Sequence, residues 1–252
     1  ASKWYPSNFA GWTELAHKVE AMRARMPADT RIVADNFKIG AELGFALDDP
    51  RIAVLDHPLN HHHGRAPQLR LWRLHDDGRV ARNNAPRLLV VGATDVSYRE
   101  QLQRYHDLCE MIGPLPPPRV LNIDRGRQRF LLFALSSERA EGDCIAPAMA
   151  WIDTPSAGDR VARRFELQGW AFKDGAGLSR VEVLIDGQPV AEAEYGIERP
   201  EVVGFWQKWR AGGSTDPQQP RVGFRARIDL GERIPGTYWL GLRLHGRDGS
   251  IE

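Results

Sequence analysis

The hydrophobic pattern of this chain changes character near its middle, and this change limits the possible folds more than any other feature. Before about residue 137, apolar positions at helical spacing alternate with short apolar runs of strand length. After about residue 150, strand patterns and turn sequences follow one another, with one short helical stretch. We therefore predict an α/β domain at residues 1–143, a linker at residues 144–158 and an all-β domain at residues 159–252.

The first half predicts a three-layer Rossmann-like or flavodoxin-like domain. Near-continuous apolar strands that alternate with helices are typical of a parallel sheet covered on both faces. Apolar runs at residues 120–123 and 130–135 flank a turn, so we expect them to add an antiparallel hairpin at one edge. Residues 68–74 are apolar but too short to assign. The expected helices cover residues 9–26, 37–47 and 98–112, and the expected parallel strands cover residues 31–34, 52–55 and 87–92.

The second half alternates apolar and polar residues, as in Val181, Val183 and Ile185. The pairs Asp186-Gly187 and Asp248-Gly249 are typical of tight hairpin turns, because both residues of such a turn need a positive φ. Short strands separated by turns at this spacing predict an immunoglobulin-like antiparallel β-sandwich.

Charge, apolar run length and missing motifs exclude several classes of function. The formal net charge of +1 gives no electrostatic support for a nucleic-acid partner. The longest apolar runs, at residues 88–93 and 130–135, are far too short to span a bilayer. No glycine-rich dinucleotide motif and no Walker-type phosphate loop occurs, so we predict no nicotinamide or nucleotide cofactor. No signal peptide is visible, so an exported protein would have to be a mature form or a fragment.

Polar side chains follow two of the predicted strands at the point where each strand ends. Because the carboxyl ends of parallel strands line the ligand crevice of such sheets, these residues are candidates to bind a sugar or another small polar group. The alternative is that they cap the turns that follow, as Asp and Asn often do. The candidate ligand-binding residues are Asp35, Asn36, Asp56, His57, Asn60, His63 and Arg65.

The run of histidines after the second strand invites a metal-site hypothesis. Zinc is bound by His and Asp side chains, and His57 and His61 lie four residues apart. Pro58 and Gly64 argue against a helix that would bring these two rings to one face. A solvated loop explains the run as well, so we predict no metal ligand.

Catalysis by this chain has little support in its sequence. No Gly-x-Ser-x-Gly nucleophile motif occurs, and Cys109 lies on the inward stripe of a predicted helix. A carboxylate pair, Asp35 with Asp56 or Asp56 with Asp95, could serve a hydrolase if both groups faced one substrate. A free-standing hydrolase that uses the strand ends is therefore an alternative function, but we assign no catalytic residue.

Two tryptophans of the second half are candidates for carbohydrate contact. Trp206 and Trp209 lie in a polar stretch that we expect to be irregular, where an exposed indole ring could stack on a sugar. The alternative is that they pack within the domain, as tryptophan commonly does in sandwich cores. A carbohydrate-binding protein is accordingly a further alternative function.

The chain has two cysteines, Cys109 and Cys144. In an oxidising compartment they could bridge the last helix of the first half to the segment that leaves it. A loop of that size would be worth about 3–4 kcal/mol in the chain-entropy view of disulfides. Two separate buried thiols are the alternative, and the sequence leaves both open.

Two sets of short motifs run through most of the chain. The first set is residues 6–12 (PSNFAGW), 33–41 (VADNFKIGA) and 55–65 (LDHPLNHHHGR). The second set is residues 167–171 (LQGWA), 181–187 (VEVLIDG), 195–200 (YGIERP), 223–224 (GF) and 242–249 (LRLHGRDG). The first set resembles the soluble tail of bacterial polytopic glycosyltransferases of the protein-mannosyltransferase-like and aminoarabinose-transferase-like group. The second set resembles the Gly-Trp-Ala module that ends such tails, which also appears on other bacterial surface and envelope proteins.

This resemblance implies a periplasmic region that is attached to the inner membrane, in the full-length protein, through its own transmembrane domain. Family members transfer a sugar from a polyprenyl-phosphate carrier to an acceptor, and a divalent cation assists in some of them. Their catalytic acid lies between membrane helices that this sequence does not contain, so no catalytic residue is carried over and no cofactor is expected here. The expected role is to recognise the glycan acceptor or the polyprenyl-phosphate sugar, without activity of the chain alone.

Overall fold

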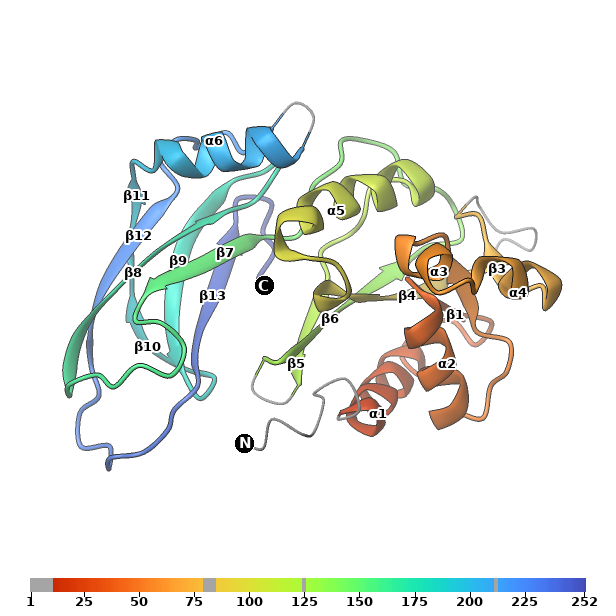
Figure 1. The fold of residues 1–252 in the computed structure, drawn as a ribbon, viewed down its shortest axis with the longest axis horizontal. Helices are drawn as coiled ribbons and strands as arrows, with labels where there is room; N and C mark the ends of the chain where they lie inside the picture. Colours follow the sequence, from red (N-terminus) through yellow and green to blue (C-terminus); the bar gives the residue numbers. More distant parts are fainter. Residues whose placement is uncertain (1–10, 79–84, 124–125, 211–212) are drawn as a thin grey trace. The chain divides into compact units, whose positions relative to one another are not determined.

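The structure of the protein is a computed structural model, which describes residues 11–78, 85–123, 126–210 and 213–252. The chain divides into two compact units, Ala1–Cys144 and Ile145–Glu252. The first unit is a mixed, mainly parallel α/β sheet domain, and the second is built from two antiparallel sheets (Figure 1). These architectures confirm the predicted fold class.

The sheet of the first unit has the strand order β3-β2-β1-β4-β6-β5. Strands β3, β2, β1 and β4 run parallel, whereas β6 is antiparallel to both β4 and β5. The pair β5 and β6 is the antiparallel hairpin predicted from the sequence. The strands are β1 (Arg31–Ala34), β2 (Ala53–Leu55), β3 (His75–Asp76), β4 (Arg87–Gly92), β5 (Arg119–Ile123) and β6 (Gln128–Leu135).

Helices cover both faces of this sheet, as strands that are apolar on both sides require. Figure 1 shows α1 and α2 on one side of the sheet and α5 on the other. On the first side, Ile32 and Ala34 of β1 pack in one core with Leu43 of α2. The bounds are α1 (Trp12–Arg23), α2 (Phe37–Ala46), α3 (Pro58–His62), α4 (Ala66–Leu71) and α5 (Tyr98–Ile112), with a 3-10 turn, η2, at Ala93–Asp95. The first residues of the expected helix 9–26, up to residue 10, lie outside the described residues.

The strand order creates a topological switch point between β1 and β4. From β1 the chain moves outward through β2 to β3, and then returns to the other side of β1 as β4. In open α/β sheets, ligands bind outside the carboxyl ends of the strands at such a point. Asp35 directly follows β1 and Asp95 ends the turn that follows β4, so both acids lie at this position in the fold.

The second unit consists of a sheet β10-β9-β13 and a sheet β11-β12-β8-β7, in which all neighbouring strands are antiparallel. Val181 and Val183 of β9 share one core with Leu167 of β8 and Phe224 of β12, which accounts for the alternating pattern. The strands are β7 (Met149–Thr154), β8 (Arg164–Phe172), β9 (Leu178–Ile185), β10 (Gln188–Glu192), β11 (Glu194–Ile197), β12 (Gly223–Asp229) and β13 (Leu240–Gly246).

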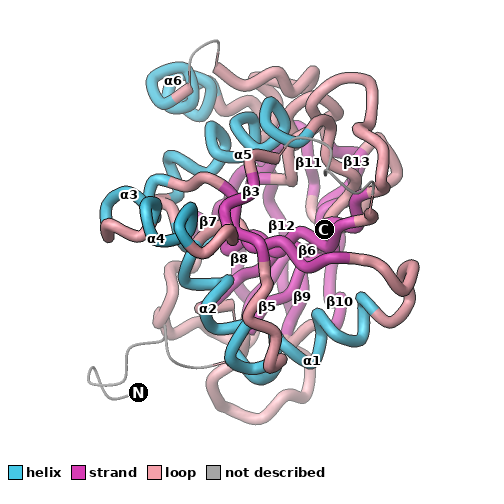
Figure 2. The backbone as a smooth tube through the Cα atoms, turned by 90° about the vertical axis from the view of Figure 1, so that its right-hand side faces the viewer, coloured by secondary structure: helices cyan, strands magenta, loops and turns pink. Residues whose placement is uncertain are grey.

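Two local features of this half differ from the expectations. Residues 144–158, the predicted linker, contain strand β7, which pairs with β8 and belongs to the second unit. The stretch expected to be irregular forms helix α6 (Pro200–Trp209), which Figure 2 shows as a regular helix. Pro200 suits the first position of a helix, and Val202 and Trp206 bury one face of it.

Candidate functional site

Three strand ends of the first unit bring polar side chains to one edge of the sheet. Asp35 and Asn36 follow β1, Asp56 and His57 follow β2, and Asp95 follows β4. Because these strands are parallel, their carboxyl ends lie at the same edge. These five residues follow strands that were predicted from the sequence, and their hydrogen bonds show what each one contacts.

Asp35 is 1% exposed and is held by Arg104 of α5. Arg104 Nε donates a hydrogen bond to Asp35 Oδ1 at 3.1 Å, and Arg104 Nη2 donates to the same oxygen. Arg104 Nη2 also donates to the main-chain oxygen of Asp56 at 2.9 Å. One guanidinium thus joins the ends of β1 and β2 to a helix. Buried charges persist only when they are paired and hydrogen-bonded, so this is a structural junction.

His57 is buried beside the same carboxylate. Its Nδ1 accepts a hydrogen bond from the Leu59 amide at 3.0 Å, which makes His57 the N-cap of α3. The proton of the neutral ring is therefore on Nε2, which faces Asp35 Oδ2 at 3.6 Å. That separation is too long for a hydrogen bond, and among the described residues neither atom has another partner. Burial lowers the pKa of His57, Asp35 opposes this shift, and Arg104 adds to it.

Asn36 and Asp95 connect the ends of β1 and β4. Asn36 Oδ1 caps α2 by accepting hydrogen bonds from the amides of Lys38 at 3.0 Å and Ile39 at 3.2 Å. Asn36 Nδ2 donates to Asp95 Oδ2 at 2.8 Å, and Lys38 Nζ pairs with the other oxygen of Asp95. A Cβ on Gly92 would lie 2.4 Å from Asp95 Oδ2, so a larger residue at position 92 would displace the carboxylate that Asn36 and Lys38 contact.

Asn60 is buried and connects α3 to α2. Its Oδ1 accepts from the Phe37 amide at 2.9 Å, and its Nδ2 donates to the Leu55 carbonyl at 2.8 Å. Three of the candidate ligand-binding residues, Asn36, His57 and Asn60, therefore serve as cap or turn residues in this structure. We call these three, together with Asp35, Asp95 and Arg104, the buried frame.

Polar side chains that reach solvent lie just beyond this frame, directly after β2, on α3 and on the turn after α3. His61 Nε2 lies 2.7 Å from Asp56 Oδ1. Partial burial raises the pKa of Asp56, but the hydrogen bond and charge of His61 outweigh it and hold that pKa below its usual value. The ring of His63 and the guanidinium of Arg65 lie 5.5 Å and 5.9 Å from the ring of Phe37. We call Asp56, His61, His63 and Arg65 the exposed rim.

The rim offers imidazole, guanidinium and carboxylate groups to solvent, while the frame holds them in place. Charged donors of this kind bind phosphate oxygens and sugar hydroxyls well. Pro58 takes the first position of α3, where no amide hydrogen is needed, so it begins a short helix there. His57 caps this helix and is buried beside Asp35, whereas His61 pairs with Asp56 at the surface, so the helix does not bring the two rings to one face. Among the residues that the structure describes, no group of three or more His, Cys, Asp or Glu side chains could hold a metal ion.

Sequence reasoning missed Arg104 and Lys38 and considered Asp95 only as a partner for Asp56. A signal for Arg104 exists, because it lies between Leu102 and Tyr105 on the buried part of α5. An arginine in such a position is rarely buried without an acidic partner. That partner, Asp35, lies 69 residues away in the sequence, so only the fold identifies it.

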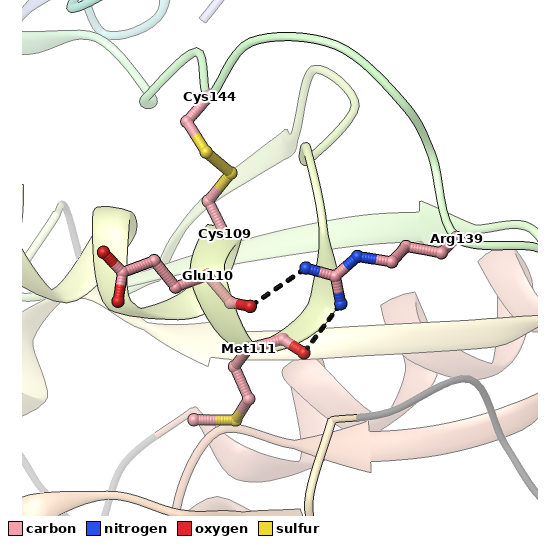
Figure 3. Close-up of a disulfide and its surroundings, with 5 residues drawn as sticks. All are labelled: Cys109, Glu110, Met111, Arg139 and Cys144. Carbon is pink, nitrogen blue, oxygen red and sulfur yellow. Dashed lines mark hydrogen bonds between the residues drawn. A yellow bond between two sulfur atoms is a disulfide. The ribbon is translucent and has the colours of Figure 1, made fainter.

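Cys109 and Cys144 form a disulfide, which confirms the bridged alternative (Figure 3). The bond ties the last turn of α5 to the end of the first unit. Arg139 donates to the main-chain oxygens of Glu110 at 2.9 Å and Met111 at 3.1 Å. These carbonyls have no partner within the helix, so a disulfide and an arginine hold the same helix end.

In the second unit, the prediction that Trp206 is exposed for sugar stacking is wrong. Trp206 is 0% exposed, and its ring lies 6.2 Å from that of Trp170 and 5.6 Å from that of Phe172. It is buried because α6 directs it into the unit. Trp209, at the end of α6, is partly exposed and lies 6.4 Å from the ring of Phe205. Carbohydrate contact by Trp209 stays a prediction.

Comparisons with known proteins give one distant likeness. No protein-family model and no curated protein matches the chain. Among solved structures, it is similar to a chain described under the heading "Structures of Clostridium thermocellum CbhA fibronectin(III)-like modules". The match has 12% sequence identity and a TM-score of 0.26, and it covers 55% of this chain and 73% of that chain. Within the described part of the protein, no helix combines the length and apolar character needed to cross a bilayer.

Proposed function

We propose that this chain is the periplasmic part of a membrane glycosyltransferase that takes its sugar from a polyprenyl-phosphate carrier. In this proposal the α/β unit recognises the sugar-phosphate or the glycan acceptor, and the transfer reaction takes place in a transmembrane domain outside this chain. The observation that carries the proposal is the exposed rim at the carboxyl edge of the parallel sheet, beside the switch point.

The chemistry of the rim supports a ligand that carries phosphate and hydroxyl groups. Arg65 and His63 supply donors for phosphate oxygens, and Asp56 with His61 supplies an acceptor and a donor for sugar hydroxyls. His61, His63 and Arg65 lie on α3 and the turn after it, which His57 and Asn60 fix to the strand ends, and Asp56 lies between β2 and α3. A rigid support of this kind lowers the entropy that binding has to overcome.

The Cys109–Cys144 disulfide supports a location outside the cytoplasm. Disulfides persist in oxidising compartments such as the bacterial periplasm and are rare where thiols are kept reduced. The resemblance to the tails of periplasm-facing glycosyltransferases agrees with this location, so we propose that the chain is attached to the inner membrane by its own transmembrane domain.

The burial of Asp35 disfavours the alternative of a free-standing hydrolase. Its carboxylate is engaged by Arg104, whereas the carboxylate of Asp56 is turned outward to His61. A two-carboxylate mechanism needs both groups on one substrate. The alternative of a carbohydrate-binding sandwich loses support for the same kind of reason, since Trp206 lies inside the core.

The proposal is tested with the purified chain and a short-chain polyprenyl-phosphate hexose. We expect weak but measurable binding by NMR titration and no multiple turnover. Binding should be at least about fivefold weaker when Arg65→Gln and His61→Ala are combined, because each substitution removes a charge-assisted contact. Arg25→Gln with His17→Ala is the matched control, since both residues are exposed and lie on or near α1.

Two outcomes would contradict the proposal. Multiple turnover by the isolated chain would show that it holds its own catalytic centre. Equal binding by the rim variant and the α1 control would show that the rim is not the recognition surface. Reading the gene upstream gives an independent check, because the proposal requires a reading frame that continues into several apolar helices.

A further inference from the structure

Two neighbouring apolar side chains project into solvent at the carboxyl end of α4. Leu71 is 78% exposed and Trp72 is 62% exposed. The preceding residue on the inward face, Leu69, is buried and anchors the helix to the core. Large apolar side chains that stand together in water are unusual enough on a folded domain to indicate a partner.

The charge around this apolar pair is strongly positive. Arg70 and Arg73 flank Leu71 and Trp72, and among the described residues no carboxylate pairs with either guanidinium. Residues 66–75 contain two arginines, one histidine and no Asp or Glu. The whole chain has a formal net charge of only +1, so this cationic density is local.

The backbone holds the apolar pair in a fixed position. The Trp72 amide donates to the Gln68 carbonyl at 2.9 Å, and the Leu74 amide donates to the Leu69 carbonyl at 2.9 Å. Arg73 has a positive φ of 60°, which closes the helix with a left-handed cap. These bonds pair the main-chain amides of the tip, so it can approach an apolar medium without exposing unpaired amides to it.

We propose that the tip formed by Arg70, Leu71, Trp72 and Arg73 docks on the surface of an anionic phospholipid bilayer. Tryptophan favours the interface between lipid headgroups and acyl chains, and leucine adds buried apolar area below it. Arginine on either side pairs with lipid phosphates and is attracted by the negative surface potential. Charge complementarity therefore favours a bilayer over an uncharged protein groove. The inference uses none of the rim residues and does not depend on the proposed function.

The test is flotation of the full chain with vesicles of phosphatidylglycerol and phosphatidylcholine in equal parts. We expect binding that falls about fivefold for Arg70→Gln, and about fivefold again when Arg73→Gln is added. Leu71→Ala with Trp72→Ala should weaken binding by about tenfold, since it removes the apolar anchor. Pure phosphatidylcholine vesicles, or about 0.5 M salt, should remove most of the binding.

Matched controls come from exposed residues elsewhere in the chain. Ile234 has the same exposed fraction as Leu71, 78%, and lies in the second unit, so Ile234→Ala should leave binding unchanged. Arg25→Gln removes one exposed cation from α1's end and should also have no effect. Quenching of tryptophan fluorescence by brominated lipid should occur in the natural chain and disappear in Trp72→Phe.

The proposal is overturned by any of three results. One is the absence of binding to anionic vesicles, another is equal binding to neutral vesicles, and the third is an equal loss of binding in the control variants. Self-association of the chain that Leu71→Ala and Trp72→Ala abolish, without any vesicle binding, would likewise overturn it and assign the tip to a second copy.

Discussion

Single residues at the strand ends divide into those whose polar atoms face inward and those whose polar atoms face solvent. Asp35 and Asn36 are adjacent in sequence to strand β1, yet one is bound by an arginine of α5 and the other caps α2. Asp56 and His61 pair with each other at the surface. Burial, more than residue type, therefore separates the residues that support the strand ends from those whose polar atoms remain available to solvent, and substitutions should show the difference.

Asp35→Asn is expected to destabilise the first unit strongly. The change removes the negative charge beside a buried guanidinium, and breaking a buried pair in this way costs about 3–5 kcal/mol. Asp56→Asn is the matched control, because a solvent-exposed pair with His61 is worth about 1 kcal/mol or less. Hydrogen exchange at β1 and β4 in increasing urea measures the free energy of unfolding of both variants. If Asp35→Asn kept full stability and lost only ligand binding, Asp35 would be a site residue and not part of the frame.

His57 is expected to make the first unit less stable in acid. Unfolded histidine titrates near pH 6.5, and burial lowers the pKa in the folded state, so below that pH the unfolded chain binds more protons than the folded one. The stability from His57 is therefore fully present above about pH 6.5 and is lost as the pH falls toward the folded pKa. Protonation of Nδ1 would also break the cap on Leu59.

The measurement is the urea midpoint of the first unit between about pH 7 and pH 5, for the natural chain and for His57→Asn. Asparagine can cap a helix but does not titrate, so the variant should show a flatter profile. Other groups near the ring, namely Asp35, Asp56, Asp95 and Arg104, remain in both proteins and cancel in the comparison. Identical profiles would mean that His57 titrates alike in the folded and unfolded chain.

At the scale of helices and strands, the sequence predicts the elements better than the faces they bury. Short apolar runs in the sequence locate β1, β2, β4 and the hairpin of β5 and β6. The sequence predicts one short helix in the second half, but the polar residues around Trp206 and Trp209 make that stretch look irregular. The packing of Trp206 on Trp170 shows which side of α6 is inward. The frame is missed in part for the same reason: Arg104 reaches Asp35 only after α5 has packed on the sheet.

Trp206→Ala is expected to cost the second unit about 3–5 kcal/mol, because it leaves a large cavity beside two aromatic rings. Phe205→Ala is the neighbouring control on the same helix, and its side chain is partly exposed, so its cost should be much smaller. Hydrogen exchange at β8 and β12 in increasing denaturant measures the loss of stability in each of the two variants. Equal costs would mean that α6 does not pack as the structure shows.

The whole molecule consists of two units, each with its own apolar core and its own sheets. The change of hydrophobic pattern near residue 140 predicts this division, since a helix-and-strand domain and an all-strand domain need different periodicities. The pattern does not predict that β7 belongs to the second unit, because the strand lies among Gly, Pro and Ser residues and is identified only by its pairing with β8.

Because the disulfide lies entirely within the first unit, its reduction should affect one unit and spare the other. The bridge joins positions 35 residues apart, and its loss should lower the stability of the first unit by about 3–4 kcal/mol, since the unfolded chain regains the entropy that the closed loop removes. Hydrogen exchange in increasing urea, with and without reductant, follows β1 and β4 for one unit and β9 and β12 for the other. The Cys109→Ala, Cys144→Ala double variant should reproduce the reduced state and stop responding to reductant. A parallel loss of protection in all four strands would show that the two units unfold as one, and that separate cores do not make them independent.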